Sequence, residues 1–330
     1  MPEQATEPRV RIDVLLDESD RRAALDDTTF WSLRATPKEL PAVWLYDEAG
    51  SLLFEQITRL PEYYPTGAER EILTNHAAEI ATRSEARTLV ELGAGTSEKT
   101  RLLLDALQAA GSLERFVPLD ASEEVLHASA YAIAAEYPTI GVHAIVGDFE
   151  RHLHALPPGD DRLIAFLGST IGNLDPARRQ VLLRAVAAAL GPGDSFLLGV
   201  DLVKDPAMIV AAYNDPQGVT ERFVRNALTV VNRELHGNFR QERFAFEARW
   251  DSVNEWMDIG FRALEAHTVR LGKLEIDVAF ELGERLRLEI SAKFRPDGIE
   301  RELGSAGLAT ELFVTDSERR FALLLARRSD

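Results

Sequence analysis

Between residues 86 and 203, short apolar runs alternate with helical patterns. The runs RTLVELG, RFVPLD, GVHAIVGD, RLIAFLG and SFLLGVDL are bounded by polar or turn residues, which is typical of buried strands. The segments between them, such as PARRQVLLRAVAAAL, carry apolar residues at helical spacing. Five strands in this order predict a doubly wound parallel sheet whose ligands bind at the carboxyl ends of the strands.

The pattern changes after residue 203. Residues 204–237 have helical periodicity, whereas 242–294 contain longer alternating runs, including TVRLGKLEIDVAFELGERLRLEISAKF. A helix at IERELGSAGL and strands at TELFVTD and RRFALLLAR then resemble the closing elements of a class I methyltransferase sheet. We predict an α/β protein with two domains. The first is a Rossmann-like methyltransferase domain formed by residues 68–203 together with 293–330. The second is a discontinuous α+β substrate-binding domain formed by residues 16–67 together with 204–292.

The stretch LPEYYPTGAERE contains two adjacent tyrosines before a predicted helix. Thr66 and Glu69 have the spacing of a capping box, so we expect the helix to begin near Gly67. Tyr63 and Tyr64 then lie on the loop that leads into the helix. Two interpretations stay open: the rings pack beneath the helix, or a hydroxyl group faces a ligand.

The composition narrows the possible partners. The chain has 330 residues, a net charge of −17 and no cysteine. Nucleic acids and anionic membranes are poor partners for such an acidic surface, and disulfides, thiolate metal sites and a cysteine nucleophile are excluded. The apolar stretches 181–190 and 195–203 are too short to span a bilayer, and the start MPEQATEPRVRID has no apolar leader core. We therefore expect a cytoplasmic protein.

A glycine turn follows the first predicted strand in VELGAGTSEKT. Gly93 and Gly95 allow the backbone to turn sharply and to approach a ligand closely. The third glycine of a dinucleotide-binding motif is replaced by Glu98, whose carboxylate would repel a pyrophosphate. The motif alone fits a ligand-binding loop and a simple tight turn equally well.

Acidic strand ends add information to the glycine turn. Asp120 ends the second predicted strand, where a carboxylate accepts from both ribose hydroxyls of an adenosine. Asp148 ends the third, suited to the adenine amino group, with Phe149 beside the base. Glu91 and Lys99 flank the turn and suit the amino and carboxylate ends of a methionine moiety. Each acid alone is common at a strand end, but together they indicate S-adenosylmethionine, a methyl donor that is consumed.

The loop FLGSTIGNLDP follows the fourth predicted strand. Class I methyltransferases present residues to the substrate at this position, so we assign Gly168 and Asn173 to substrate binding. Asn173 can hold a carboxylate or an amide. The Asn-Pro-Pro-aromatic motif of many base and glutamine methyltransferases is missing from the loop, which argues against those substrates.

Six stretches together resemble one family. They are TRLPEYYPTGAEREIL, LVELGAGTSEKTRLLLDAL, FLGSTIGNLDP, LLGVDLVKD, VVNRELHGNF and SAKFRPD. In this order they are similar to the histidine Nα-methyltransferases of ergothioneine biosynthesis, which convert histidine to its trimethylated betaine, hercynine. The similarity runs from about residue 36 to the end of the chain and implies three successive transfers from S-adenosylmethionine.

The resemblance also implies roles around the reacting amine. Tyr46, in WLYDEAGS, corresponds to the residue near the substrate amine, and we assign it the catalytic role of orienting the nitrogen and relaying its proton. Asn173 and Tyr213 correspond to residues that hold the substrate carboxylate.

The imidazole-binding residues implied by the resemblance are Tyr63, Glu289 and Ser291. Glu289 and Ser291 are two apart and so point to one face of a strand. An exposed strand carboxylate is the alternative interpretation of Glu289. The chain departs from the family in the apolar pocket wall, where Ile259 stands near Met257 in place of a pocket methionine.

We expect L-histidine as the small-molecule partner, no bound metal, no nucleic acid or membrane, and a monomer. Two alternatives remain open at this point: a methyltransferase for another amino acid or small amine, and a regulatory subunit that binds S-adenosylmethionine without turnover.

Overall fold

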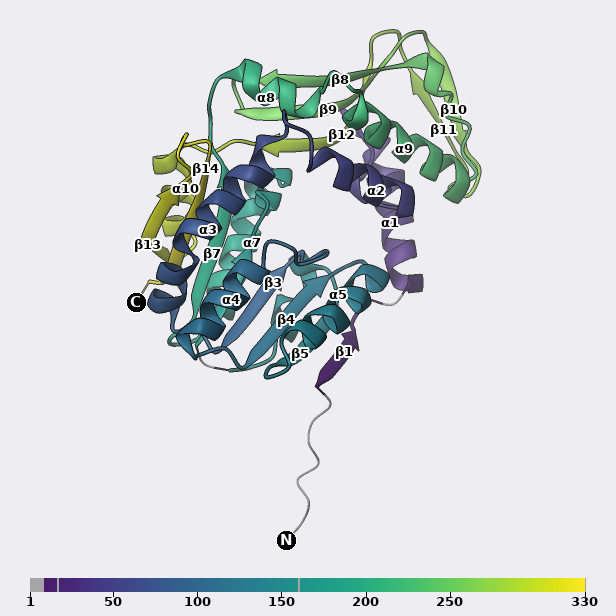
Figure 1. Cartoon of the computed structure of the whole chain (residues 1–330). Coiled ribbons are helices and arrows are strands. Elements are labelled where there is room, and N and C mark those ends of the chain that lie inside the picture. Colours follow the sequence, from purple (N-terminus) through teal and green to yellow (C-terminus); the bar gives the residue numbers. More distant parts are fainter. Residues whose placement is uncertain (1–8, 17, 160, 330) are drawn as a thin grey trace. The chain divides into compact units, whose positions relative to one another are not determined.

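The computed structural model describes residues 9–16, 18–159 and 161–329. Its chain divides into two compact units (Figure 1). The first unit contains the described residues of 1–17 together with 68–202 and 294–330, and the second contains 18–67 and 203–293. The start of the chain before residue 9, on which the expectation of no leader partly rests, lies outside the described residues.

The first unit is built on a mainly parallel sheet of eight strands in the order β1-β5-β4-β3-β6-β7-β14-β13. The strands are β1 (Val10–Val14), β3 (Thr88–Leu92), β4 (Arg115–Asp120), β5 (Gly141–Val146), β6 (Arg162–Phe166), β7 (Ser195–Asp201), β13 (Leu308–Thr315) and β14 (Phe321–Arg328). β14 runs antiparallel to both β7 and β13. The order reverses at β3, between β4 and β6, which is the switch point where such sheets bind ligands. The predicted doubly wound class I methyltransferase sheet is confirmed.

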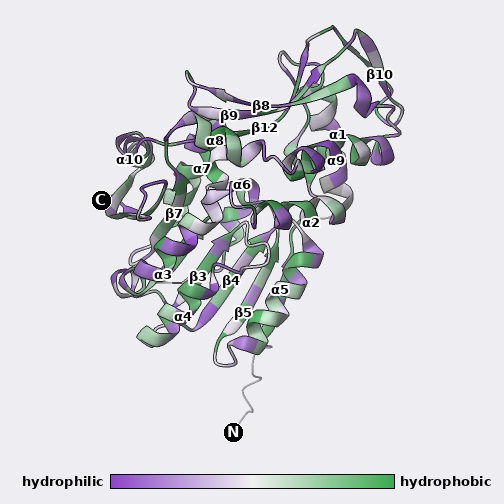
Figure 2. Cartoon of the chain, turned by 45° about the horizontal axis from the view of Figure 1, so that its top comes forward, coloured by the Kyte–Doolittle hydropathy of each residue, from purple (hydrophilic) through white to green (hydrophobic). Residues whose placement is uncertain are grey.

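Helices cover this sheet. They are α3 (Tyr64–Ser84), α4 (Arg101–Ala110), α5 (Glu123–Glu136), α6 (Phe149–His152), α7 (Pro176–Ala189) and α10 (Pro296–Ser305), with 3-10 turns η2 (Leu153–Ala155) and η3 (Thr170–Asn173). Apolar side chains of α3, α4 and α5 form one buried cluster with the strands. Figure 2 shows hydrophobic residues along the strands, whereas the helices also carry hydrophilic ones. No helix of the described residues is long and apolar enough to cross a membrane.

The first strand of the sheet lies where no strand is predicted. Val10–Val14 pairs in parallel with β5, so this segment, which lies outside both predicted domain ranges, belongs to the first unit. VRIDV is too short for its periodicity to reveal a strand, and Val14 at its end is 51% exposed. Backbone pairing with β5, which the sequence pattern does not show, defines this edge strand.

The helix after the two tyrosines begins earlier than predicted. α3 starts at Tyr64, so Thr66 lies inside the helix and the predicted capping box is wrong. Pro65 is compatible with this start because the first turn of a helix needs no backbone donor there. Glu69 does not cap the helix; its carboxylate is fully buried and pairs with Lys99.

The second unit combines helices with a four-stranded sheet in the order β2-β12-β9-β8 and a separate hairpin, β10-β11. Its elements are α1 (Glu18–Ser32), β2 (Lys38–Glu39), η1 (Ala42–Leu45), α2 (Glu48–Ile57), α8 (Pro206–Tyr213), α9 (Val219–Glu234), η4 (Gln241–Arg243), β8 (Phe244–Asp251), β9 (Trp256–Ala263), β10 (His267–Leu271), β11 (Ile276–Phe280) and β12 (Arg285–Ala292). Buried side chains from the helices and both sheets form a single apolar core.

A β-bulge interrupts the pairing of β12 with β9 at Leu288. The pairs on either side of it are Arg287–Gly260, Glu289–Ile259 and Ser291–Met257. Because side chains alternate between faces, an unbroken strand would place Glu289 on the same face as Arg287. The extra residue shifts the alternation by one position, so Glu289 and Ser291 share the face of their buried partners on β9.

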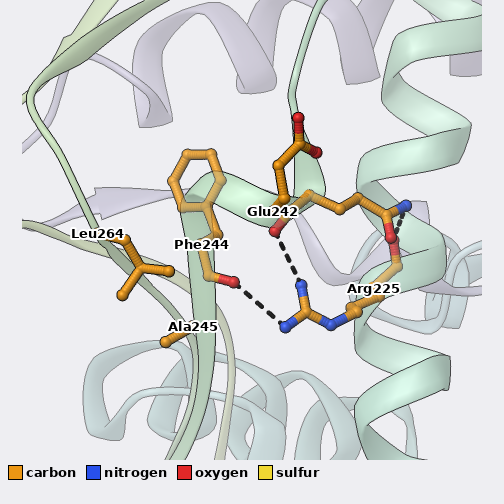
Figure 3. Close-up of a pocket in the computed structure, with 6 residues that line it drawn as sticks. Arg225, Glu242, Phe244, Ala245 and Leu264 are labelled. Atoms are coloured by element: carbon orange, nitrogen blue, oxygen red, sulfur yellow. Dashed lines mark hydrogen bonds between the residues drawn. The ribbon is translucent and has the colours of Figure 1, made fainter.

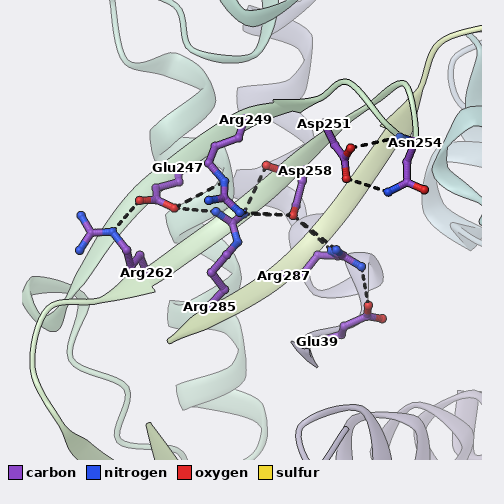
Figure 4. A network of polar contacts seen from close by, with 9 residues as sticks. All are labelled: Glu39, Glu247, Arg249, Asp251, Asn254, Asp258, Arg262, Arg285 and Arg287. Carbon is purple, nitrogen blue, oxygen red and sulfur yellow. Dashed lines mark hydrogen bonds and ion pairs between the residues drawn. The ribbon is translucent and has the colours of Figure 1, made fainter. Parts of the chain in front are cut away.

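The opposite face of the sheet is charged (Figure 4). Arg285 and Arg287 donate to the carboxylate of Asp258 over 3.0 and 3.2 Å. Arg285 also pairs with Glu247, and Arg287 with Glu39. The two arginines before the bulge therefore belong to a partly buried ion-pair network on this face, while the polar residues after the bulge lie on the opposite face.

We expect Gly260→Ala to destabilise the protein, because an added Cβ would lie 2.2 Å from the Leu286 carbonyl oxygen and 3.0 Å from Arg287 Cα. Relief requires the bulged strand to move, and such overpacking typically costs about 1–3 kcal/mol of unfolding free energy. Urea denaturation measures this loss. The matched control is Gly141→Ala in β5, where an added Cβ meets nothing within 4 Å. Equal stability of the two variants would contradict the account of the bulge.

Candidate active site

The glycine turn after β3 is held against the end of β4. Gly93 and Gly95 have φ values of +69° and +51°, which favour glycine. The Gly95 N–H donates to the Asp120 carboxylate over 2.9 Å, and the Gly93 N–H donates to the Leu119 carbonyl over 2.8 Å. The Phe149 ring lies close enough that a Cβ added at Gly93 would be 3.9 Å from it. Four predicted cofactor residues therefore lie together.

Asp120 ends β4 with a carboxylate that also accepts from the Ser122 N–H over 2.8 Å. Burial raises the pKa of Asp120 above its usual value, and the backbone donors oppose this shift. An ionised carboxylate has about four acceptor positions, so hydrogen bonds to these amides are compatible with accepting a ligand hydroxyl as well. The local chemistry fits the ribose of S-adenosylmethionine.

Asp148 and Phe149 lie directly after β5. The Asp148 side chain accepts from the Glu150 N–H over 2.8 Å and caps α6. The Phe149 ring packs against Phe166 at a centroid distance of 5.0 Å. Helix capping alone accounts for an aspartate at this position, so binding of the adenine amino group stays a prediction.

A buried glutamate connects Lys99 to the loop after β6. Glu69 pairs with Lys99, and its other oxygen accepts from the Gly168 N–H over 2.7 Å. Gly199 makes room for this carboxylate, since an added Cβ there would lie 2.4 Å from Glu69. Glu69 is not among the site residues predicted from the sequence, because its spacing from Thr66 imitated a cap.

Glu91 lies beneath the glycine turn and is 5% exposed. The hydroxyls of Ser97 and Thr100 donate to its carboxylate. Burial raises the pKa of Glu91 to about 7, although these donors and the nearby Lys99 lower it. A buried acid of this kind suits an ammonium ligand, as expected for the methionine moiety.

Asn173, which we predict to bind the substrate, is the last residue of η3 in the loop after β6.

In the second unit, three predicted tyrosines share one aromatic cluster. The Tyr63 ring contacts Tyr213 edge to face at a centroid distance of 6.0 Å. Phe54 links Tyr63 to Tyr46 at centroid distances of 6.5 and 5.7 Å, and Tyr46 also contacts Phe223 at 5.3 Å. Phe54 is not among the predicted residues; its apolar position on α2 gave no reason to prefer a site over the core.

The adjacent tyrosines of the loop have different surroundings. Tyr64 is 7% exposed, and its hydroxyl accepts from Lys204 over 2.8 Å. Tyr63 is only partly buried and lies in the aromatic cluster. Tyr64 packs in the core of the second unit, whereas the substrate-facing role of Tyr63 stays a prediction.

Tyr46 is 45% exposed as a whole residue. Desolvation nevertheless raises the pKa of its hydroxyl well above the usual value, with further contributions from Glu289, Tyr63 and Tyr213. Tyr46 therefore keeps its proton at neutral pH. The hydroxyl can orient an amine and exchange protons through hydrogen bonds, but it is no phenolate base.

Glu289 and Ser291 lie on the inner face of β12, together with a lysine that was not predicted. Burial raises the pKa of Glu289 to about 7, and the positive charge of Lys293 lowers it in part. Ser291 and Tyr213 share a hydrogen bond of 2.8 Å, and Lys293 donates to both hydroxyls. Strand alternation could have identified Lys293, which lies two residues beyond Ser291.

The predicted residues thus form one group in each unit. The first unit carries the cofactor residues with Gly168 and Asn173, and the second carries the tyrosines with Glu289 and Ser291. A shallow hollow of about 350 Å³ beside β8 contains none of them (Figure 3). It is lined by Arg225, Gln241, Glu242, Phe244, Ala245 and Leu264. Within the described ranges, no three histidine or acidic side chains are grouped to hold a metal ion.

The sheet order, the glycine turn and the acidic strand ends define a class I methyltransferase that depends on S-adenosylmethionine. Residues 25–328 match the family model described as histidine-specific methyltransferase, SAM-dependent. The chain belongs to this family.

The chain is similar to several known proteins. The chain is 51% identical to histidine N-alpha-methyltransferase of Mycobacterium tuberculosis, covering 97% of this chain and all of the relative. It is also 51% identical to the enzyme of the same name from Mycolicibacterium smegmatis, over 90% and 92% of the two chains. Ergothioneine biosynthesis protein 1 of Neurospora crassa is 33% identical over 85% of this chain and 32% of that protein. A solved S-adenosylmethionine-dependent methyltransferase from Clostridium acetobutylicum has a TM-score of 0.45 at 13% identity, over 78% of this chain and 91% of that chain.

We expect Asp120→Asn to weaken the binding of S-adenosylmethionine by about tenfold or more, because an amide N–H₂ replaces one acceptor and the negative charge is lost. Isothermal titration calorimetry measures the affinity for the cofactor. The matched control is Asp105→Asn on α4, whose carboxylate accepts from the Tyr137 hydroxyl. If both variants bind the cofactor as the parent protein does, Asp120 has no part in the cofactor site.

Proposed function

We propose that this methyltransferase transfers three methyl groups from S-adenosylmethionine to the α-amino nitrogen of L-histidine and so forms hercynine, the first step of ergothioneine biosynthesis. One observation carries the choice of substrate. Beyond the bulge, β12 presents Glu289 and Ser291 on the buried face of its sheet, in a chain of the histidine-specific family.

In this proposal Glu289 accepts from one imidazole nitrogen, and Ser291 pairs with the other, with the Tyr63 hydroxyl nearby. A pocket with these groups disfavours amino acids that lack ring nitrogens, because such side chains offer no hydrogen-bonding group to the carboxylate or the hydroxyl. The half-buried carboxylate with its raised pKa supports a role in ligand binding, since a solvated strand glutamate would keep its ordinary value.

The substrate carboxylate is held by Asn173 and Tyr213, with Gly168 in the same loop as the asparagine. Asn173 offers an amide N–H₂ donor and Tyr213 a hydroxyl donor. Anchoring the carboxylate and the imidazole of one amino acid leaves its α-amino nitrogen in a defined place. Most of the rate then comes from holding that nitrogen about 3 Å from the reacting carbon.

S-adenosylmethionine supplies an electrophilic methyl group, and its carbon–sulfur bond breaks as the new carbon–nitrogen bond forms. The nitrogen must be neutral, whereas a free α-amino group is mostly protonated near neutral pH. Tyr46 orients the nitrogen lone pair and relays its proton. The high pKa of the Tyr46 hydroxyl supports relay through hydrogen bonds and argues against outright removal of the proton.

The product carries a fixed positive charge, which the aromatic cluster is suited to accept. Tyr46, Phe54 and Phe223 contact one another through their rings. The faces of aromatic rings attract alkylated ammonium groups by about 0.5–2 kcal/mol. Each successive methyl group thus increases the contact between the amine and these rings.

Ile259 keeps a second candidate open: a methyltransferase for another amino acid or small amine. Its backbone pairs with that of Glu289, so its side chain borders the proposed imidazole position. For either substrate we propose a cytoplasmic monomer. The net charge of −17 argues against a nucleic-acid partner.

Incubation with S-adenosylmethionine and a panel of amino acids tests the substrate. We expect a mass increase of three methyl groups on histidine, with mono- and dimethylhistidine as intermediates in single-turnover samples. Mass spectrometry of the mixture measures both. Methylation of another amino acid in place of histidine would refute the proposal and favour the second candidate.

Histidine binding should also depend on the ionisation of Glu289. Because the pKa of Glu289 is about 7, its accepting carboxylate form becomes dominant only above that pH. We expect the affinity for histidine, measured by calorimetry with S-adenosylhomocysteine present, to rise as the pH increases through about 7. Glu289→Gln should weaken binding and remove this rise beyond what the imidazole itself contributes near pH 6.5. An identical pH profile in Glu289→Gln would show that this carboxylate does not face the ring.

A further inference from the structure

Lys293 is a buried cation at the end of β12. The residue is 4% exposed, and its ammonium donates to the Tyr213 hydroxyl and to the Ser291 hydroxyl, each over 2.8 Å. The two hydroxyls are also 2.8 Å apart and share a hydrogen bond. Lys293, Tyr213 and Ser291 thus form a closed triangle, which we call the Lys293 triangle.

The protons of the Lys293 triangle can be counted. An ammonium group only donates, so both hydroxyl oxygens accept from Lys293. The contact between the two hydroxyls uses one of their two protons. The other hydroxyl proton therefore points out of the triangle. A hydroxyl that accepts from a cation is also polarised into a stronger donor.

The side chain also fixes the ring of Tyr213. The Lys293 Nζ atom lies 4.6 Å from the ring centroid, in the range of a cation–π contact. Ring and hydroxyl are thus held by the same ammonium group. Ser291 lies beyond the bulge on β12 and Lys293 follows the end of that strand, while Tyr213 comes from the end of α8, so two separate elements build the triangle.

A buried lysine at this position is unfavourable for stability alone. Burying an ammonium group carries a desolvation penalty, and apolar residues of similar volume often serve stability equally well or better. The hydrogen bonds to the two neutral hydroxyls offset part of that penalty. The arrangement suits a site that needs a cation beside a carboxylate ligand and the acid Glu289.

We propose that Lys293 is a positioning residue of the substrate pocket, which orients the hydroxyls of Tyr213 and Ser291 so that the one proton they do not share points toward the bound amino acid. This inference rests on the proposed function. Lys293 acts through the two hydroxyls and not on the reacting atoms.

The charge of Lys293 also reaches Glu289. Two titratable groups act on this carboxyl: Lys293, which follows β12, and Tyr46, which follows η1. Tyr63, before α3, and Tyr213, at the end of α8, act in turn on Tyr46. Among them only the lysine is cationic at neutral pH, and it lowers the pKa of Glu289 against the effect of burial. Removing the charge should move the pH dependence of histidine binding to higher pH.

Lys293→Met tests the inference by removing the charge at similar volume. We expect the Kd for histidine, measured with S-adenosylhomocysteine present, to rise by about tenfold or more. The rise of affinity with pH should shift upward, while the Kd for S-adenosylhomocysteine stays unchanged. Lys293→Gln, which keeps a donor without the charge, is the second variant and replaces the first if that protein does not fold.

A matched control separates a local effect from general destabilisation. Lys38→Met removes a second lysine of the same unit. Lys38 is partly buried, pairs with Glu284, and lies on β2, the strand beside β12. We expect this change to leave the histidine Kd and its pH dependence as in the parent protein. A thermal unfolding curve for each variant confirms that the proteins compared are folded.

A double-mutant cycle tests whether Lys293 acts through its partners. If it does, Tyr213→Phe combined with Lys293→Met should weaken histidine binding less than the sum of the two single effects. Strict additivity, or a folded Lys293→Met protein with unchanged Kd and pH profile, would overturn the inference. Absence of histidine binding by the parent protein would instead refute the proposed function, so the two failures are distinguishable.

Discussion

The β-bulge at Leu288 is the constraint on which the second unit depends. A strand carries one alternating pattern of side chains, yet β12 must provide arginines for an ion-pair network on one face and polar groups for the inner face. One extra residue divides the strand into two parts with opposite alternation. Gly260 makes this possible, because any side chain there would collide with the bulged backbone. Glu289, Ser291 and Lys293 owe their shared direction to this arrangement.

The consequence is an inner face that carries groups of opposite charge. A half-buried acid with a pKa of about 7 lies on β12 and a buried lysine follows the end of the strand, beside hydroxyls and aromatic rings. Such groups are costly to bury and contribute little to stability, which is a common property of ligand-binding sites. Glu91, with a similarly raised pKa, plays the equivalent part beneath the glycine turn of the first unit. Each unit thus keeps one acid whose protonation a cationic or N–H ligand can shift.

Much of the fold and part of the candidate site could be predicted from the sequence. The alternation of strand and helix patterns and the glycine turn predict the sheet correctly, because buried parallel strands appear in the sequence as short continuous apolar runs. Strand β1 could not be predicted, because its pairing with β5 defines it and its own five residues carry no clear pattern. The local spacing of Thr66 and Glu69 predicts a capping box. Glu69 instead contacts Lys99 and Gly168, which are distant in the chain, so local spacing cannot reveal its role. The alternation of Glu289 and Ser291 was evident, but their direction depends on a bulge that no periodicity reveals.

The central claim is that the bulged strand presents its polar residues to an imidazole ring. A crystal structure of the protein with histidine and S-adenosylhomocysteine tests this claim most directly. The account predicts one ring nitrogen within about 3 Å of the Glu289 carboxylate and the other within hydrogen-bond distance of Ser291. A histidine ring bound away from both residues, or Glu289 turned to the charged face with its arginines, would contradict it.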